Sequence, residues 1–117
     1  MSKRDPHILV NDILIAIEKI GRFTAGMNHE SFLKDEKTID AVVRNIEVIG
    51  EAVRQLPADF KDSNAHIPWN LIGGMRNRIV HEYFGLDLEI IWQVIEHDLR
   101  QLEVRLRGLQ PDKTERD

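Results

Sequence analysis

Residues 75–85 bring together side chains that can act on a phosphate ester. They include two arginines, an asparagine, a histidine and the only tyrosine of the chain: Arg76, Asn77, Arg78, His81 and Tyr83. A histidine exchanges a proton near neutral pH. An arginine stays charged and presents a fork that matches phosphate oxygens. Polar groups inside an apolar run depart from the local rules of folding, and such departures are where function is sought.

Arg76 and His81 would together suffice to cleave an RNA strand without a metal ion. The 2′-OH of the RNA would be the nucleophile, and His81 would act as its general base or acid. Arg76 would bind the phosphate and stabilise the charge of the transition state. Asn77 could orient His81 or contact the RNA.

The spacing of these residues separates them into two faces of an ideal helix. We expect a helix over residues 69–83, on which Arg76 and Tyr83 share a stripe beside core positions. Asn77 and His81 lie four apart on an adjoining face, and Arg76 is about 140° from His81. The two would converge if the last turn loosens, or if two copies of the helix pair about a two-fold axis. The spacing therefore hints that a working site needs a dimer.

A structural reading of the same residues involves no catalysis. An arginine and a histidine in the last turn of a helix meet the negative end of the helix dipole favourably. A tyrosine on a core stripe packs its ring and exposes its hydroxyl. Residue types and spacing alone favour this reading, since a short motif is only a hypothesis.

Apolar residues recur at helical spacing and predict four main helices with short connections. The first begins at Asp5-Pro6 and ends near residues 21–24, the second runs from Asp35 to Leu56, the third from about Trp69 to Tyr83 with Gly85 as its stop, and the fourth from Asp87 to Leu106. Residues 30–33 add one short turn. Because no stretch alternates as a strand does, we predict an all-α, antiparallel bundle of four to five helices.

Two further predictions concern the linker before the third helix and a glycine inside the second helix. Residues 57–68 read as a polar linker with Phe60 and Ile67 tucked inward. Gly50 falls inside the second helix, where glycine costs roughly 1 kcal/mol against alanine. We expect a close approach of another helix at Gly50.

Composition limits the classes of protein to which this chain can belong. The 117 residues suggest one domain with one core, over residues 1–108, followed by a flexible tail at 109–117. No apolar run approaches the roughly 20 residues that span a bilayer. The absence of cysteine fits a cytoplasmic location. With a net charge of −4, any nucleic-acid binding must come from a local basic patch.

The motif formed by Arg76, four residues, His81, Glu82 and Tyr83 resembles the Arg-x4-His-x-Tyr motif of HepT-type HEPN toxins. The resemblance extends over roughly residues 5–106. Four other segments carry it: residues 44–52 (Arg-Asn-Ile-Glu-Val-Ile-Gly-Glu-Ala), Pro68-Trp69, residues 74–77 and Asp98-Leu99.

The resemblance implies an all-α HEPN-like bundle that forms a homodimer through helices near the motif. It implies a metal-independent endoribonuclease acting on RNA such as tRNA or mRNA, with Arg76 and His81 lining a cleft at the dimer interface and Asn77 beside them. It also implies a partner, the cognate minimal nucleotidyltransferase antitoxin of a type VII-like toxin–antitoxin pair. That partner would use ATP to attach AMP to Tyr83 and so block the nuclease. No cofactor and no metal are implied.

Several residues remain as supporting candidates. Glu51, on the second helix, could position Arg76, because an arginine in the middle of a bundle needs a partner. Glu47 and Glu51 are otherwise expected to be solvated or to pair with Arg44 and Arg54 of the same helix. Arg78 could support RNA binding.

The remaining histidines do not form a tight ligand pattern for a metal. They are His7, His29, His66 and His97.

A different class of function also fits the sequence. The chain could be a non-catalytic helical subunit that docks a nucleotidyltransferase or binds its substrate. RNA cleavage by the isolated protein without metal distinguishes the two.

Overall fold

Three aspartates begin the three long helical stretches, as the sequence predicts. In the computed structural model, which describes residues 5–81 and 85–109, the side chains of Asp5, Asp35 and Asp87 each accept a hydrogen bond from a backbone N–H in the first turn, at 2.8, 3.0 and 3.1 Å. Each bond satisfies a donor that helix geometry leaves without a partner. The helices that follow these caps are α1 (Pro6–Phe23), α3 (Glu36–Gln55) and α7 (Leu88–Gln93).

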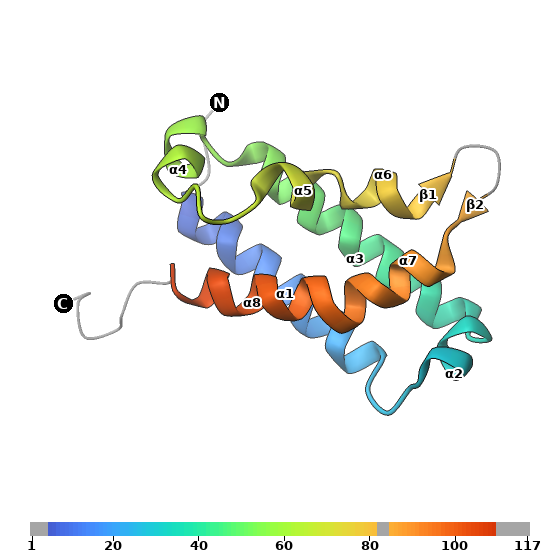
Figure 1. Cartoon of the computed structure of the whole chain (residues 1–117). Coiled ribbons are helices and arrows are strands. Elements are labelled where there is room, and N and C mark those ends of the chain that lie inside the picture. Colours follow the sequence, from blue (N-terminus) through green and yellow to red (C-terminus); the bar gives the residue numbers. More distant parts are fainter. Residues whose placement is uncertain (1–4, 82–84, 110–117) are drawn as a thin grey trace.

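Successive long stretches of the chain run in opposite directions (Figure 1). The short helix α2 (His29–Leu33) connects α1 to α3. The last stretch continues from α7 through a π-helical turn, η1 (Val94–Asp98), into α8 (Leu99–Arg107). The predicted all-α antiparallel bundle is therefore confirmed.

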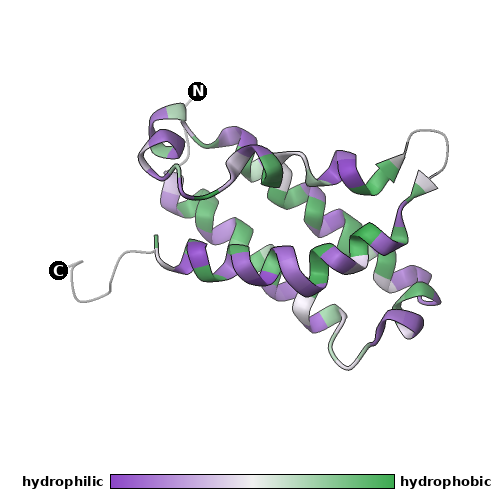
Figure 2. Ribbon diagram, in the orientation of Figure 1, coloured by the Kyte–Doolittle hydropathy of each residue, from purple (hydrophilic) through white to green (hydrophobic). Residues whose placement is uncertain are grey.

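One core unites these helices. Hydrophobic residues lie along their inner faces (Figure 2). Burying each such side chain contributes about 1.5–3 kcal/mol. The side chains that are almost fully buried come from every long stretch: Leu9, Ile13, Ile20, Ile46, Ile49, Ile91, Val94 and Leu106. Among the helices of the described ranges, none has the length and apolar character to cross a bilayer.

At Gly50 the backbone of α3 lies near that of α5 (Trp69–Gly73), which confirms the expected close approach. A Cβ atom placed on Gly50 would lie 3.5 Å from the carbonyl oxygen of Gly73, which is an ordinary contact. One methyl group fits there, whereas a branched side chain would meet the backbone of α5.

We therefore expect opposite results from two substitutions at Gly50. Gly50→Ala should raise the free energy of unfolding by up to about 1 kcal/mol, because alanine favours the helix. Gly50→Val should lower it by about 1–3 kcal/mol through overpacking. Urea unfolding of both variants checks this, and a stabilised Gly50→Val would contradict the packing described.

The linker predicted at residues 57–68 contains a helix that the sequence does not predict, α4 (Ala58–Ser63). Pro57, with φ −62°, precedes it. Its six residues are mostly polar and none is fully buried, so no apolar period revealed it. The expectation for the two apolar linker residues holds, since Ile67 is buried and Phe60 packs against the core.

The third predicted helix is not continuous, and the prediction of no strand was wrong. The segment breaks at Gly74 into α5 and α6 (Met75–Ile79), and the helix then ends. Val80 is extended, at φ −112° and ψ 118°. The next residues form a two-stranded antiparallel pair, β1 (Val80–His81) and β2 (Gly85–Leu86).

The strand pair ends the helix because it offers the backbone other partners. The backbone N–H of Asp87 donates to the carbonyl of Ile79 at 2.7 Å, and Val80 and Leu86 face each other and pack on the core. Gly85 has φ +79°, a conformation that glycine adopts readily. Gly85 thus serves the strand pair rather than stopping a helix that reaches Tyr83.

Candidate active site

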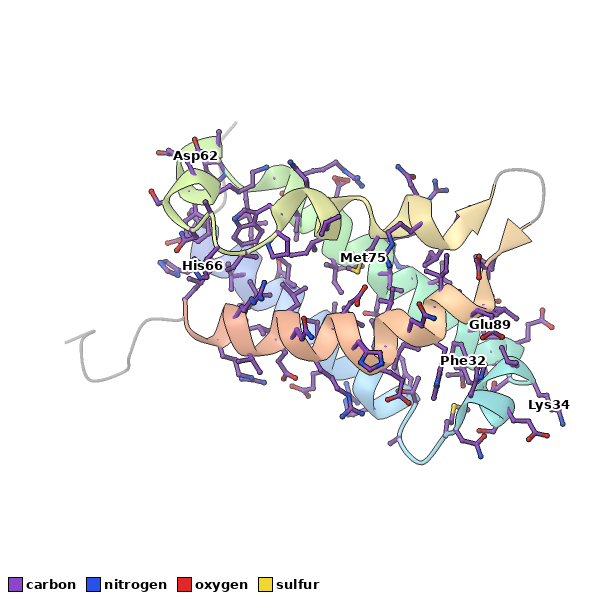
Figure 3. The ribbon with its side chains drawn as sticks, viewed as in Figure 1. Phe32, Lys34, Asp62, His66, Met75 and Glu89 are labelled. Atoms are coloured by element: carbon purple, nitrogen blue, oxygen red, sulfur yellow. The ribbon has the colours of Figure 1, made fainter. Side chains whose placement is uncertain are left out.

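α6 turns two apolar side chains inward and three polar ones outward. Met75 and Ile79, one turn apart, are buried, and Met75 points into the bundle (Figure 3). Arg76, Asn77 and Arg78 are exposed. One short helix therefore anchors the segment in the core and presents its cationic side chains at the surface.

Arg76 faces α3. Its Nε lies 3.8 Å from Oε2 of Glu47, and the two side chains are 50% and 46% exposed. Such a separation is a loose ion pair in contact with water, which contributes little to stability. The guanidinium group is therefore held near one carboxylate but remains accessible to a ligand.

Arg78 points away from Arg76, as expected from the spacing, and contacts the π-helical turn. Its Nη1 donates to Oδ2 of Asp98 at 3.2 Å. Beside this pair lies a hollow of about 160 Å³ between α5, α6 and α8. The supporting role in RNA binding proposed for Arg78 stays a prediction, but the contact with Asp98 joins α6 to η1.

Glu51 is not the carboxylate that pairs with Arg76, contrary to the prediction from the sequence. Its carboxylate lies 3.7 Å from Nε of Arg54, on the same helix. Glu47, one turn earlier, occupies the position expected for Glu51. The sequence predicts that Glu47 is solvated or pairs with Arg44 or Arg54 of its own helix, because only the packing of α6 on α3 brings Arg76 within reach.

A broad groove runs along the outer side of α3, between α3 and α1, and Glu47 and Glu51 line it. Its volume is about 520 Å³, and Lys19, Arg44 and Arg54 line it as well. Charges of both signs alternate there, so the groove is not a purely basic track for a nucleic-acid backbone.

His81 lies on a different kind of backbone from Arg76. It is the second residue of β1, paired across the strand with Gly85, whereas Arg76 is helical. The angle of about 140° expected between them on an ideal helix therefore does not apply. Tyr83, the predicted modification site, lies outside the described residues.

A family model described as "Ribonuclease HepT-like" matches residues 13–109 of this chain. The chain belongs to the HepT-like ribonuclease family. Over 107 residues it is 39% identical to the "Probable ribonuclease HepT" of Thermococcus cleftensis, covering 92% of this chain and 97% of that protein. Over 114 residues it is 38% identical to "Putative RNase MJ0127" of Methanocaldococcus jannaschii, covering 94% of both. No solved structure matches the chain significantly.

Two other histidines of this HepT-like chain, His29 and His7, contact aromatic rings. His29 stacks on Trp92, with ring centroids 5.9 Å apart, and its Nε2 lies 3.0 Å from a carboxylate oxygen of Glu89. His7 meets the ring of Phe60 edge-on. Within residues 5–81 and 85–109, no three histidine, aspartate or glutamate side chains gather as ligands for a metal ion.

The contact between Arg78 and Asp98 should matter more for local geometry than for global stability in this HepT-like fold. Both side chains are more than 40% exposed, so a double-mutant cycle with Arg78→Met and Asp98→Asn should give a coupling energy below about 1 kcal/mol. Urea unfolding of the four proteins measures it. A coupling of several kcal/mol would show instead that this contact holds the bundle together.

Proposed function

We propose that this HepT-like protein is a metal-independent endoribonuclease and the toxin of a type VII-like toxin–antitoxin pair. The observation that carries the proposal is the placement of Arg76. It sits on the exposed side of α6, loosely paired with one carboxylate, and β1, which carries His81, follows directly after α6. Family membership and relatives named as ribonucleases support the same activity.

In the proposed reaction, His81 removes the proton from a 2′-OH of the RNA. The 2′ oxygen then attacks the adjacent phosphorus, the P–O5′ bond breaks, and the O5′ leaving group takes up a proton. The products are a 2′,3′-cyclic phosphate and a 5′-OH end. Arg76 binds the non-bridging phosphate oxygens and stabilises the negative charge that grows in the transition state.

A homodimer would complete this site. An isologous contact places the same surface of two copies face to face, so a dimer through α6 would bring two Arg76 and two His81 side chains to one cleft. One His81 could then take the 2′-OH proton while the other gives a proton to O5′. Asn77, which is exposed beside Arg76, would contact the RNA or orient a histidine.

The regulating partner in this proposal is a minimal nucleotidyltransferase that transfers AMP from ATP to the Tyr83 hydroxyl. Pyrophosphate leaves, and a phosphodiester remains on the tyrosine. Tyr83 follows His81 by two residues, so the added charge and base would lie near the RNA phosphates and oppose their binding.

Cleavage by the purified protein in excess EDTA tests the activity. The substrates are tRNA, an mRNA, and a DNA of the same sequence as the mRNA, which lacks the 2′-OH. We expect cleavage of an RNA to products with 2′,3′-cyclic phosphate ends, and no cleavage of the DNA. If neither RNA is cleaved and the protein instead binds a nucleotidyltransferase, the proposal fails in favour of a docking subunit.

A further inference from the structure

α6 is attached to the rest of the bundle by contacts between charged side chains as well as by its two buried residues. Several ion pairs among the described residues join positions only three or four apart in the sequence. The pairs made by Arg76 and Arg78 instead reach other elements, α3 and η1. The short helix that carries Arg76 is thus held from two sides.

Glu47 has a rigid support. On α3 it lies next to Ile46, which is fully buried, and two residues before Ile49, which is buried as well. Gly50, one turn further, is where the backbone of α3 comes close to Gly73, just before α6. The close approach of the two backbones brings a side chain fixed on a 20-residue helix within reach of Arg76.

We infer that Glu47 is a positioning residue that holds the Arg76 guanidinium group for phosphate binding, an inference that rests on the proposed ribonuclease function. An arginine side chain has many rotamers, and ordering it on binding costs free energy. A carboxylate fixed nearby restricts those rotamers before the RNA arrives. The pair is too exposed and too long to serve chiefly as a stabilising contact.

The negative charge of Glu47 acts on the RNA in the opposite sense. A carboxylate beside a bound phosphate repels it, so Glu47 weakens RNA binding while it orients Arg76. These two effects predict a combination that neither alone would give. When the charge is removed, the RNA should bind more tightly, and cleavage of bound RNA should slow.

Glu47→Gln tests this, because it removes the charge and keeps the shape of the side chain. We expect kcat to fall on the order of tenfold, because a guanidinium group that is no longer oriented stabilises the transition state less well, and KM to fall severalfold. Glu47→Asp should restore part of the lost kcat. Glu18→Gln is the matched control, since Glu18 also lies 3.8 Å from an arginine Nε, but on α1 and within one helix.

A second measurement does not depend on cleavage. NMR relaxation of the Arg76 Nε–H should report a restrained side chain in the wild type and a mobile one in Glu47→Gln. The same resonance should be unaffected in Glu18→Gln and in Glu51→Gln. If the wild type cleaves no RNA but Arg76 loses its restraint in Glu47→Gln, the proposed function fails and the positioning role stands.

Three results would overturn the inference. One is unchanged mobility of Arg76 in Glu47→Gln, and another is release of Arg76 by Glu51→Gln rather than by Glu47→Gln. The third is a lower KM with an unchanged kcat, which would leave Glu47 as a nearby negative charge without a positioning role.

Discussion

His81→Ala should abolish RNA cleavage and leave the helical fold intact. Loss of a general base or acid lowers the rate about 10²–10⁴-fold. In the proposed dimer the substitution would remove both His81 side chains at once. The fold should survive because Val80, the neighbouring residue of β1, packs on the core, and strand pairing uses the backbone. Cleavage in EDTA gives the rate, and far-UV circular dichroism with thermal unfolding checks the fold.

Variants at Arg76 separate charge from geometry at the same site. Arg76→Lys keeps the charge but loses the planar fork that binds two phosphate oxygens, so its rate of RNA cleavage should remain far below that of the wild type. The rate of Arg76→Ala should be lower still.

A His81→Ala protein that is folded and cleaves RNA at the wild-type rate would refute the assignment of His81.

Tyr83 should gain one or more AMP units when the protein is co-expressed with the proposed nucleotidyltransferase partner, and the modified protein should no longer cleave RNA. Each AMP carries a negatively charged phosphodiester and a bulky base, which would repel and obstruct RNA beside the cleft. Intact-mass measurement detects the addition, and the cleavage assay measures the loss of activity.

Tyr83→Phe is the control, since it lacks only the acceptor hydroxyl. It should stay unmodified and remain active in the presence of the partner. Wild-type protein without added AMP masses after co-expression would count against modification at Tyr83. An equal gain of mass on Tyr83→Phe would move the modification to another residue.

The starts of the long helices could be predicted from the sequence because capping is a local interaction. Asp5, Asp35 and Asp87 each bond within their own first turn, so the signal lies within a few residues of sequence. The close approach of another helix at Gly50 could be predicted for a related reason, since a glycine inside a helix indicates a neighbour that needs the space.

The structure of the segment after Gly74 could not be predicted from such local signals. Strands of two residues have no alternation to detect, and Val80 continues the apolar spacing of α6 as though the helix went on. What ends the helix is a partner strand, Gly85–Leu86, supplied by residues later in the chain. For the same reason the pairing of Glu47 with Arg76 could not be predicted, because this contact depends on how α6 packs against α3.

The dependence of α6 on later residues has a consequence for the order of events during synthesis. A helix of five residues does not persist in water by itself, and residues 80–81 have no strand partner until residues 85–86 have been made. Asp98, which joins Arg78, comes later still. When Arg76 and His81 have just emerged from the ribosome, the nascent chain therefore still lacks the strand and the ion pair that hold this segment in place. The ribonuclease proposed here would therefore become active only after residues 85–86 and η1, which carries Asp98, have been synthesised and folded.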